Sequence, residues 1–526
     1  MGASSAFAQP VTGANIIAWN ISDSMAYLPA LVTGLGYLFA IVLGVTGIIK
    51  LKEHIENPSG TKITAGITRL MAGAMLFALP SIMEAMANAI AGNNGSGGGF
   101  GIFAQGSSDT MGSVAGGGPD AGINMLLGNV VYSIDLIPAL ITGVAYLLGL
   151  LLAYAAIIKI KEHVENPEQT KIHEGIIRLV VGGALFSLPA IYEAMYTTMT
   201  GGDMGLSGSL AGAIGGNGGL GGFFESNVAA AGDLQCGGAS SFSTFGAYTC
   251  NLVLYAAAFP SFLNAVSYLF GLVLGLWALL KIRDHVLDPR STPIWDGASK
   301  LIAGGAFFSL PYVVELMVET VTGGDFMGAA GNTFNEDGSA GCAPAGLDVA
   351  MYCFMQDVLG PMHSILNFFT FVVGIGFIMI GIGRLMKNAQ DGAKGPGGIG
   401  TLMTFLTGGI LISFNTVLSA FTESIFGAPT VMTFAELRYT NGLSTDEVKH
   451  AHTVISAIVK FMIVVGLISF VRGWFILRDV AEGNGQASKM AAITHIIGGA
   501  LAVNLGPLLN AVQETLGIAS IGLTFS

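Results

Sequence analysis

KIKEHVENPEQTKIHEGIIRLVVGGALFSLPAIYEAM, residues 159–195, decides how this chain folds. An apolar run enters this stretch, a short charged loop containing Pro167 follows, and a second apolar run leaves it. Similar sequences begin at Lys50 and at Lys281, so the chain contains an internal repeat. Because about 20 apolar residues suffice to cross a bilayer, the repeated unit predicts a transmembrane helical hairpin.

The composition places the chain among membrane proteins. Of its 526 residues, 52% are hydrophobic and only 10% are charged, whereas soluble domains carry about 25% charged residues. The net charge of −12 and the lack of a basic tract argue against direct binding of nucleic acid. The lipid bilayer is therefore the first partner that the sequence predicts.

Two more distant copies complete an all-α polytopic membrane protein of five tandem transmembrane hairpins, about ten helices. The fourth copy has the loop GRLMKNAQDGAKGPGGIG at 383–400, and the fifth begins near Val454. The predicted hairpins occupy residues 26–91, 123–200, 251–322, 354–427 and 454–526. Between them lie Gly-rich linkers at 92–122, 201–250 and 323–353, and a polar linker at 428–453. Residues 1–25 form an N-terminal tail whose Ala6–Ala8 is either a signal-peptide remnant or a small-residue segment.

The five returning runs share a signature in which a pair of small residues precedes a helix-disrupting or polar residue. We expect helix breaks at Pro80, Pro189, Pro311, Asn415 and Asn504. Proline frees a backbone carbonyl and asparagine offers a side-chain amide, and an unpaired polar group at membrane depth costs several kcal/mol. These groups must face protein or water, as part of either loose helix packing or a shared helix–helix docking site.

Basic residues predict the orientation. Every Lys and Arg before Arg438 lies in or beside a hairpin loop, including Lys50, Lys52, Lys159, Lys161, Lys281 and Arg283, and the three Gly-rich linkers contain none. The positive-inside rule places the loops in the cytoplasm and the linkers and both termini in the periplasm of a bacterial inner membrane. Lys460 and Arg472 depart from the pattern, and intramembrane cations usually face the bundle interior or a pore.

The cysteines agree with this orientation. Cys236, Cys250, Cys342 and Cys353 all fall on the linker side, where an oxidising periplasm permits disulfides. Four cysteines allow three pairings, and we favour 236–250 with 342–353 because each closes a short loop. The alternative is free thiols in flexible linkers.

The sequence predicts no enzyme. It contains no P-loop, CxxC, HExxH or GxSxG motif, so we expect no catalytic residue, no cofactor and no metal. His54, His163 and His285 could share a metal only if three loops converged, and a solvated turn explains them better. Glu84, Glu193 and Glu315 either line a cation path or mark the outer helix ends.

The loop KIKEHVENPEQTKI with its GGALFSLP return run resembles IcmD/DotP of the Dot/Icm type IVB secretion apparatus, and the fifth copy resembles IcmC/DotE and DotV. This resemblance implies a structural inner-membrane component of a secretion or conjugal transfer apparatus, with other membrane subunits and further copies of the chain as partners. Those proteins resemble single hairpins, so five fused copies suggest a fusion of separate subunits. The alternatives are a pilin-like subunit and a membrane channel or transporter.

Overall fold

The structure, a computed structural model, describes residues 28–83, 137–191, 259–323, 346–391, 398–427 and 440–518 apart from short gaps, together with four short strands. The described part is mostly helical. Five helices in it are long and apolar enough to cross a membrane: Leu31–Glu56, Leu140–Glu165, Phe262–Leu287, Leu347–Lys387 and Thr445–Ala481. The N-terminal tail, the first two Gly-rich linkers and most of the third lie outside the described residues.

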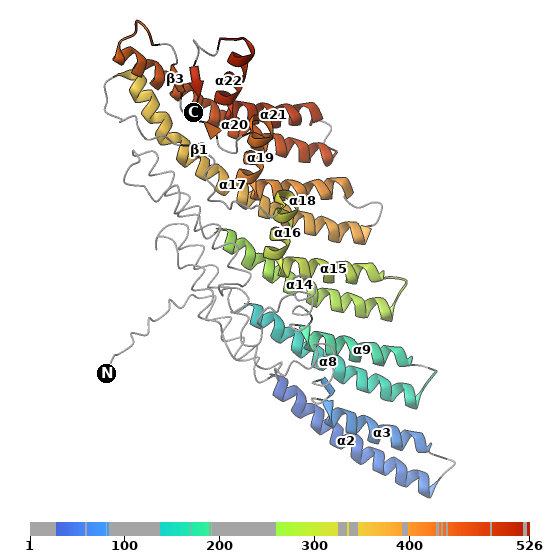
Figure 1. Cartoon of the computed structure of the whole chain (residues 1–526). Coiled ribbons are helices and arrows are strands. Elements are labelled where there is room, and N and C mark those ends of the chain that lie inside the picture. The colour runs from blue at the N-terminus through green and yellow to red at the C-terminus, as the bar shows by residue number, and fades with distance from the viewer. Residues whose placement is uncertain are drawn as a thin grey trace, which may run out of the picture.

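Each long helix packs against a shorter helix that follows it in the chain. The pairs are α2 (Leu28–Glu56) with α3 (Ile63–Phe77), α8 (Ile137–Glu165) with α9 (Ile172–Phe186), α14 (Phe259–Leu287) with α15 (Ile294–Phe308), α17 (Leu347–Asp391) with α18 (Gly398–Ile412), and α20 (Thr445–Ala481) with α21 (Lys489–Val503). Figure 1 shows the pairs side by side in one row, with the C-terminal ends of the long helices on the same side. The row runs in chain order from the first pair to the fifth.

The two arms of each pair differ in length. The long arm has 29 residues in the first three pairs, and 45 and 37 in the last two. The return arm has 15 residues in all five pairs, a rise of about 22 Å. The return arm therefore falls short of the roughly 30 Å thickness of a bilayer core.

The return arms of the last three pairs end in a sharp break. The chain turns by 81° into α16 (Leu310–Thr322), by 85° into α19 (Phe414–Phe426) and by 82° into α22 (Leu505–Thr515). We call α16, α19 and α22 the hinge helices. In Figure 1, α16 and α19 run along the row rather than parallel to the hairpins.

Two helices begin earlier than the sequence suggests. α17 starts at Leu347, inside the predicted linker 323–353, and α20 starts at Thr445, inside the predicted linker 428–453. A capping box explains the second start, because the Ser444 hydroxyl accepts from the Glu447 backbone N–H while the Glu447 carboxylate accepts from that of Ser444. Both helices are longer than a membrane crossing needs.

Short strands also form, which the all-α prediction did not include. β1 (Phe334–Asn335) pairs in parallel with β2 (Val431–Met432), with Phe334 opposite Val431. β3 (Ala435–Leu437) pairs antiparallel with β4 (Leu523–Phe525), with Ala435 opposite Phe525. The first pair joins the segment after α16 to the segment after α19, and the second ties the C-terminal strand β4 to that same segment.

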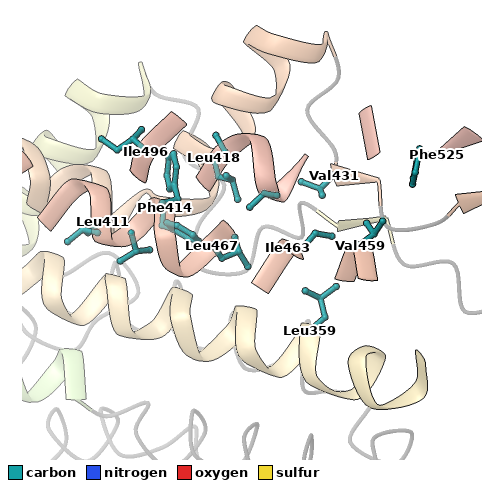
Figure 2. Close-up of a cluster of buried hydrophobic side chains, with 14 of the residues drawn as sticks. Leu359, Leu411, Phe414, Leu418, Val431, Val459, Ile463, Leu467, Ile496 and Phe525 are labelled. Atoms are coloured by element: carbon teal, nitrogen blue, oxygen red, sulfur yellow. The ribbon is translucent and has the colours of Figure 1, made fainter. Parts of the chain in front are cut away.

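The core is a series of apolar clusters at the junctions between pairs. Figure 2 shows the last of them, where Phe414 and Leu418 of α19 meet Ile463 and Leu467 of α20. All four side chains are buried. Burying an aliphatic or aromatic side chain stabilises a fold by about 1.5–3 kcal/mol when the alternative is water, so in a membrane the gain comes mainly from close packing.

Candidate functional site

Six basic residues of the first three loops are paired with carboxylates. Lys50 and Lys159 bind the glutamate three residues later, and Lys52 and Lys161 bind the glutamate four residues later. In the third loop the Nζ of Lys281 lies 3.7 Å from the Oδ2 of Asp296, and the Nη2 of Arg283 lies 2.6 Å from the Oδ1 of Asp284. The loops therefore present mixed charge, which weakens attraction to anionic lipid headgroups.

The loop histidines close their own loops. The Nδ1 of His163 lies 2.5 Å from the carbonyl oxygen of Thr170, and the Nδ1 of His285 lies 2.5 Å from that of Thr292. Because a carbonyl oxygen only accepts, Nδ1 carries the proton in both cases. The described residues contain no group of three or more His, Cys, Asp or Glu that could hold a metal. The contact across the loop accounts for the conserved spacing between the histidine and the threonine in these two copies.

Ion pairs also join neighbouring hairpins near the loops. Arg69 of α3 binds Glu165 of α8 at 2.9 Å. Glu482, directly after α20, binds Arg384 of α17 at 2.8 Å and also Arg478. Partial burial raises the pKa of Glu482, but the hydrogen bonds and charges of the two arginines outweigh it and lower the pKa to about 2.

Each return arm ends at a capping residue, which in the last three pairs is also the site of the break, and four of these five caps are polar. They are Ala78, Ser187, Ser309, Ser413 and Asn504. The three serine hydroxyls donate to the carbonyl four residues earlier, at 2.9, 2.8 and 2.8 Å. The Nδ2 of Asn504 donates in the same way to Ala500 at 3.0 Å. Each of these carbonyl oxygens also accepts the backbone N–H of the same cap residue, so the polar side chain adds a second hydrogen bond at the last turn of the helix.

The predicted break positions lie at or just after these caps. Pro311 and Asn415 come two residues after the break, in the first turn of α16 and α19, where a missing backbone N–H costs little. Asn504 is the cap itself, so it corresponds to Ser309, and the sequence alignment with Pro311 is wrong. Gly506 occupies the proline position in the fifth hairpin. Pro80 and Pro189 lie outside the described residues.

A buried polar cluster joins the last two hairpins. The Nε2 of His363 on α17 donates to the Oδ1 of Asn415 on α19 at 2.8 Å. The Nδ2 of Asn504 donates to the Oγ1 of Thr422, also on α19, at 3.0 Å. All four residues are buried. Both asparagines therefore face protein, and each ties its break to a neighbouring helix.

Two basic residues of α20 lie in different surroundings. Lys460 is buried, with its Nζ 4.4 Å from the centre of the Tyr352 ring, a cation–π contact that favours the charged amine. Arg472 is exposed on the same helix. Lys460 therefore faces the protein interior, whereas Arg472 faces away from it.

The remaining predicted residues are only partly described. Cys353 lies on α17 and is disulfide-bonded, while Cys236, Cys250 and Cys342 lie outside the described residues, so the two pairings stay predictions. Glu315 is exposed on α16. Glu84 and Glu193 are not described, so the ring of carboxylates also stays a prediction.

Comparison with protein-family models, curated proteins and solved structures found no match.

Proposed function

We propose that this chain is a structural inner-membrane component of a type IVB-like secretion or conjugal transfer apparatus, built from five tandem transmembrane hairpins. The observation that carries the proposal is the repeated hairpin, whose loop and return run resemble single-hairpin subunits of the Dot/Icm apparatus. One polypeptide would then supply, side by side, units that related machines assemble from separate chains. The closely packed junctions between hairpins suit a scaffold.

The topology we propose follows from charge and arm length. The basic loops lie in the cytoplasm, and the long arms cross the bilayer. Each return arm rises about 22 Å from the loop, which brings its break near the outer interface of a core of roughly 30 Å. There the hinge helices lie along the membrane. α16 suits this place because Val314 and Val318 are buried while Glu315 and Glu319 are exposed.

Topology is tested by labelling in intact spheroplasts with membrane-impermeant reagents. A maleimide, after mild reduction, is expected to modify Cys250, and an amine reagent is expected to spare Lys161 until the membrane is permeabilised. Labelling of Lys161 but not Cys250 in intact spheroplasts would show that the topology is the reverse of the proposed one. The topology would then no longer support the functional assignment.

The functional assignment is tested by affinity purification of the tagged full-length chain from its native membrane, with an unrelated polytopic protein of the same membrane as control. We expect other membrane subunits of a secretion or conjugation apparatus to co-purify, and deletion of the chain to abolish protein or DNA transfer. Normal transfer in the deletion strain would overturn the proposal.

A channel or transporter is the second candidate, and the buried polar cluster of His363, Asn415, Asn504 and Thr422 favours it. Polar side chains inside a membrane often mark an ion or proton path. Proton or cation flux into proteoliposomes that His363→Phe abolishes would support this function. Equal leakage through both proteins would count against it.

A further inference from the structure

The same helix–helix junction occurs four times in the row. At each junction the return arm of one hairpin packs on the long arm of the next: α3 on α8, α9 on α14, α15 on α17 and α18 on α20. Each junction therefore has two surfaces. We call the residues of the long arm that contact the preceding hairpin the accepting stripe, and the residues of the return arm that contact the following hairpin the donating face. The row shown in Figure 1 leaves one surface uncovered at each end.

The accepting stripe has the same positions in each hairpin. On α8 it is Tyr146, Leu150, Ala153 and Ile157, which are buried against α3. On α14, α17 and α20 the corresponding residues begin at Tyr268, Phe371 and Ile463, and they are buried too except Trp474 of α20, which is partly buried.

The first hairpin carries the same stripe, and among the described residues no other hairpin packs on it. α2 and α8 both have 29 residues, so the stripe of α8 corresponds to Tyr37, Ile41, Gly44 and Ile48. Tyr37 is 38% exposed, Ile41 57% and Ile48 61%. A Cβ added to Gly44 would meet nothing within 4 Å. An accepting stripe of the same pattern is thus open at this end.

The donating face is open at the other end. The tenth residue of the return arm is Ala72 in α3, Val181 in α9, Ala303 in α15 and Thr407 in α18, and all four are buried. In α21 this residue is Gly498, which is exposed and has nothing within 4 Å of an added Cβ.

A position that always faces lipid would also be exposed, but this does not explain the exposure of Gly498. The residue one position earlier is exposed in every return arm, as Met71, Val180, Ile302, Leu406 and Ile497. This position faces outward whether or not the hairpin has a neighbour. The tenth position is buried wherever a following hairpin exists and open only where none does, so its exposure marks a missing neighbour.

We propose that a second copy of this chain supplies that neighbour, with α21 of one copy seated on α2 of the next. The small Gly498 leaves room for the larger stripe of Tyr37 and Ile41. The polar positions also correspond, because His495 and Glu56 occupy at this junction the positions that Arg69 and Glu165 occupy at the first one, and an imidazole can hydrogen-bond to a carboxylate. Such a contact is heterologous, so it generates a ring or an open row of hairpins. The inference rests on the repeat and not on the secretion assignment.

Cross-linking between copies tests the geometry. Two differently tagged full-length proteins, one with Glu56→Cys and the other with His495→Cys, are co-expressed, and native membranes are treated with a short bis-maleimide under oxidising conditions. We expect a mixed-tag dimer, and a ladder of higher oligomers when one chain carries both substitutions. A dimer of Glu56→Cys with itself, or no product beyond the parent background, would overturn the proposal.

A pair of matched variants tests the interface itself. Gly498→Trp fills the donating face, whereas Ile497→Trp places the same side chain at the outward-facing position beside it. We expect Gly498→Trp to lower the oligomeric fraction at least tenfold by native mass spectrometry, and Ile497→Trp to leave it unchanged. Monomers for wild type, or equal oligomers for both variants, would contradict the interface. A far-ultraviolet spectrum and thermal midpoint like those of wild type check that each variant folds.

Discussion

Gly374 of α17 and Gly408 of α18 lie where the two arms of the fourth hairpin cross. A Cβ on Gly374 would lie 2.7 Å from the carbonyl oxygen of Gly408, and a Cβ on Gly408 would lie 3.0 Å from the carbonyl oxygen of Gly374. The pairs Gly149 with Gly182 and Gly466 with Gly499 meet in the same way. Backbone contact at glycine is a general means of packing helices in membranes, and here it fixes the crossing point of several hairpins.

Gly374→Ala is therefore expected to destabilise the protein. The new methyl group would be 2.6 Å from the Cγ1 of Ile412 as well as close to Gly408, and overpacking of this kind costs about 1–3 kcal/mol. The matched control is Gly376→Ala on the same helix, where an added Cβ meets nothing within 4 Å. Thermal unfolding in detergent should show a lower midpoint for Gly374→Ala alone. Equal midpoints for the two variants would show that the crossing tolerates a methyl group.

The sequence predicts the hairpins because each has a charged loop between two apolar runs. It does not predict the 15-residue limit of the return arms, because the residues after the break are also apolar. Val313, Val314 and Val318 of α16 continue the run that α15 begins. Hydropathy reads both helices as one crossing, and only packing against neighbouring helices decides where the chain turns.

The break residue was missed for a related reason. Ser309 in GGAFFSLP reads as one more small residue, whereas the adjacent proline is an obvious helix breaker. In the fifth hairpin, aligning the Gly498–Gly499 pair with Gly304–Gly305 places Asn504 near the proline position. In the structure Gly499 corresponds to Gly304, which shifts Asn504 to the position of Ser309. The available signal is a Ser or Asn nine residues after the basic or histidine residue in the second, third and fifth return arms, at Ser187, Ser309 and Asn504.

Pro311→Ala is expected to leave the break in place. The fourth hairpin bends by 85° with Asn415 at the proline position, so proline is not required for the turn. Spin labels at Ile302→Cys on α15 and Glu319→Cys on α16 would report the distance across the break by pulsed electron resonance, in a parent whose native cysteines are replaced by serine. The distance distribution should stay unchanged by Pro311→Ala. A shift to the longer distance of one straight helix would show that proline creates the turn.

His363 and Asn415 are expected to be energetically coupled. Removing either partner leaves a buried polar group without its hydrogen bond, which costs about 1–3 kcal/mol. A double-mutant cycle with His363→Ala, Asn415→Ala and the double variant measures the coupling from chemical unfolding. We expect a double variant less destabilised than the sum of the two single variants, by about 0.5–3 kcal/mol. Strict additivity would mean that the contact contributes nothing.

Glu482 is expected to make stability depend on acid pH. Its pKa in the folded protein is lowered to about 2, and the unfolded value is about 4.3. The unfolded chain therefore binds the proton first as pH falls. The contribution of Glu482 is present above the unfolded pKa and is lost between about pH 4.3 and pH 2.

Glu482→Gln removes this dependence, and thermal midpoints in detergent from pH 7 to pH 2 measure it. The variant should be less stable than wild type at pH 7, because Arg384 and Arg478 lose their carboxylate partner. The two midpoints should converge as the pH falls toward 2. Glu319→Gln, which changes an exposed carboxylate of α16, is the control and should follow the wild-type profile. Parallel profiles for Glu482→Gln and wild type would mean that the carboxylate is not held ionised by the two arginines.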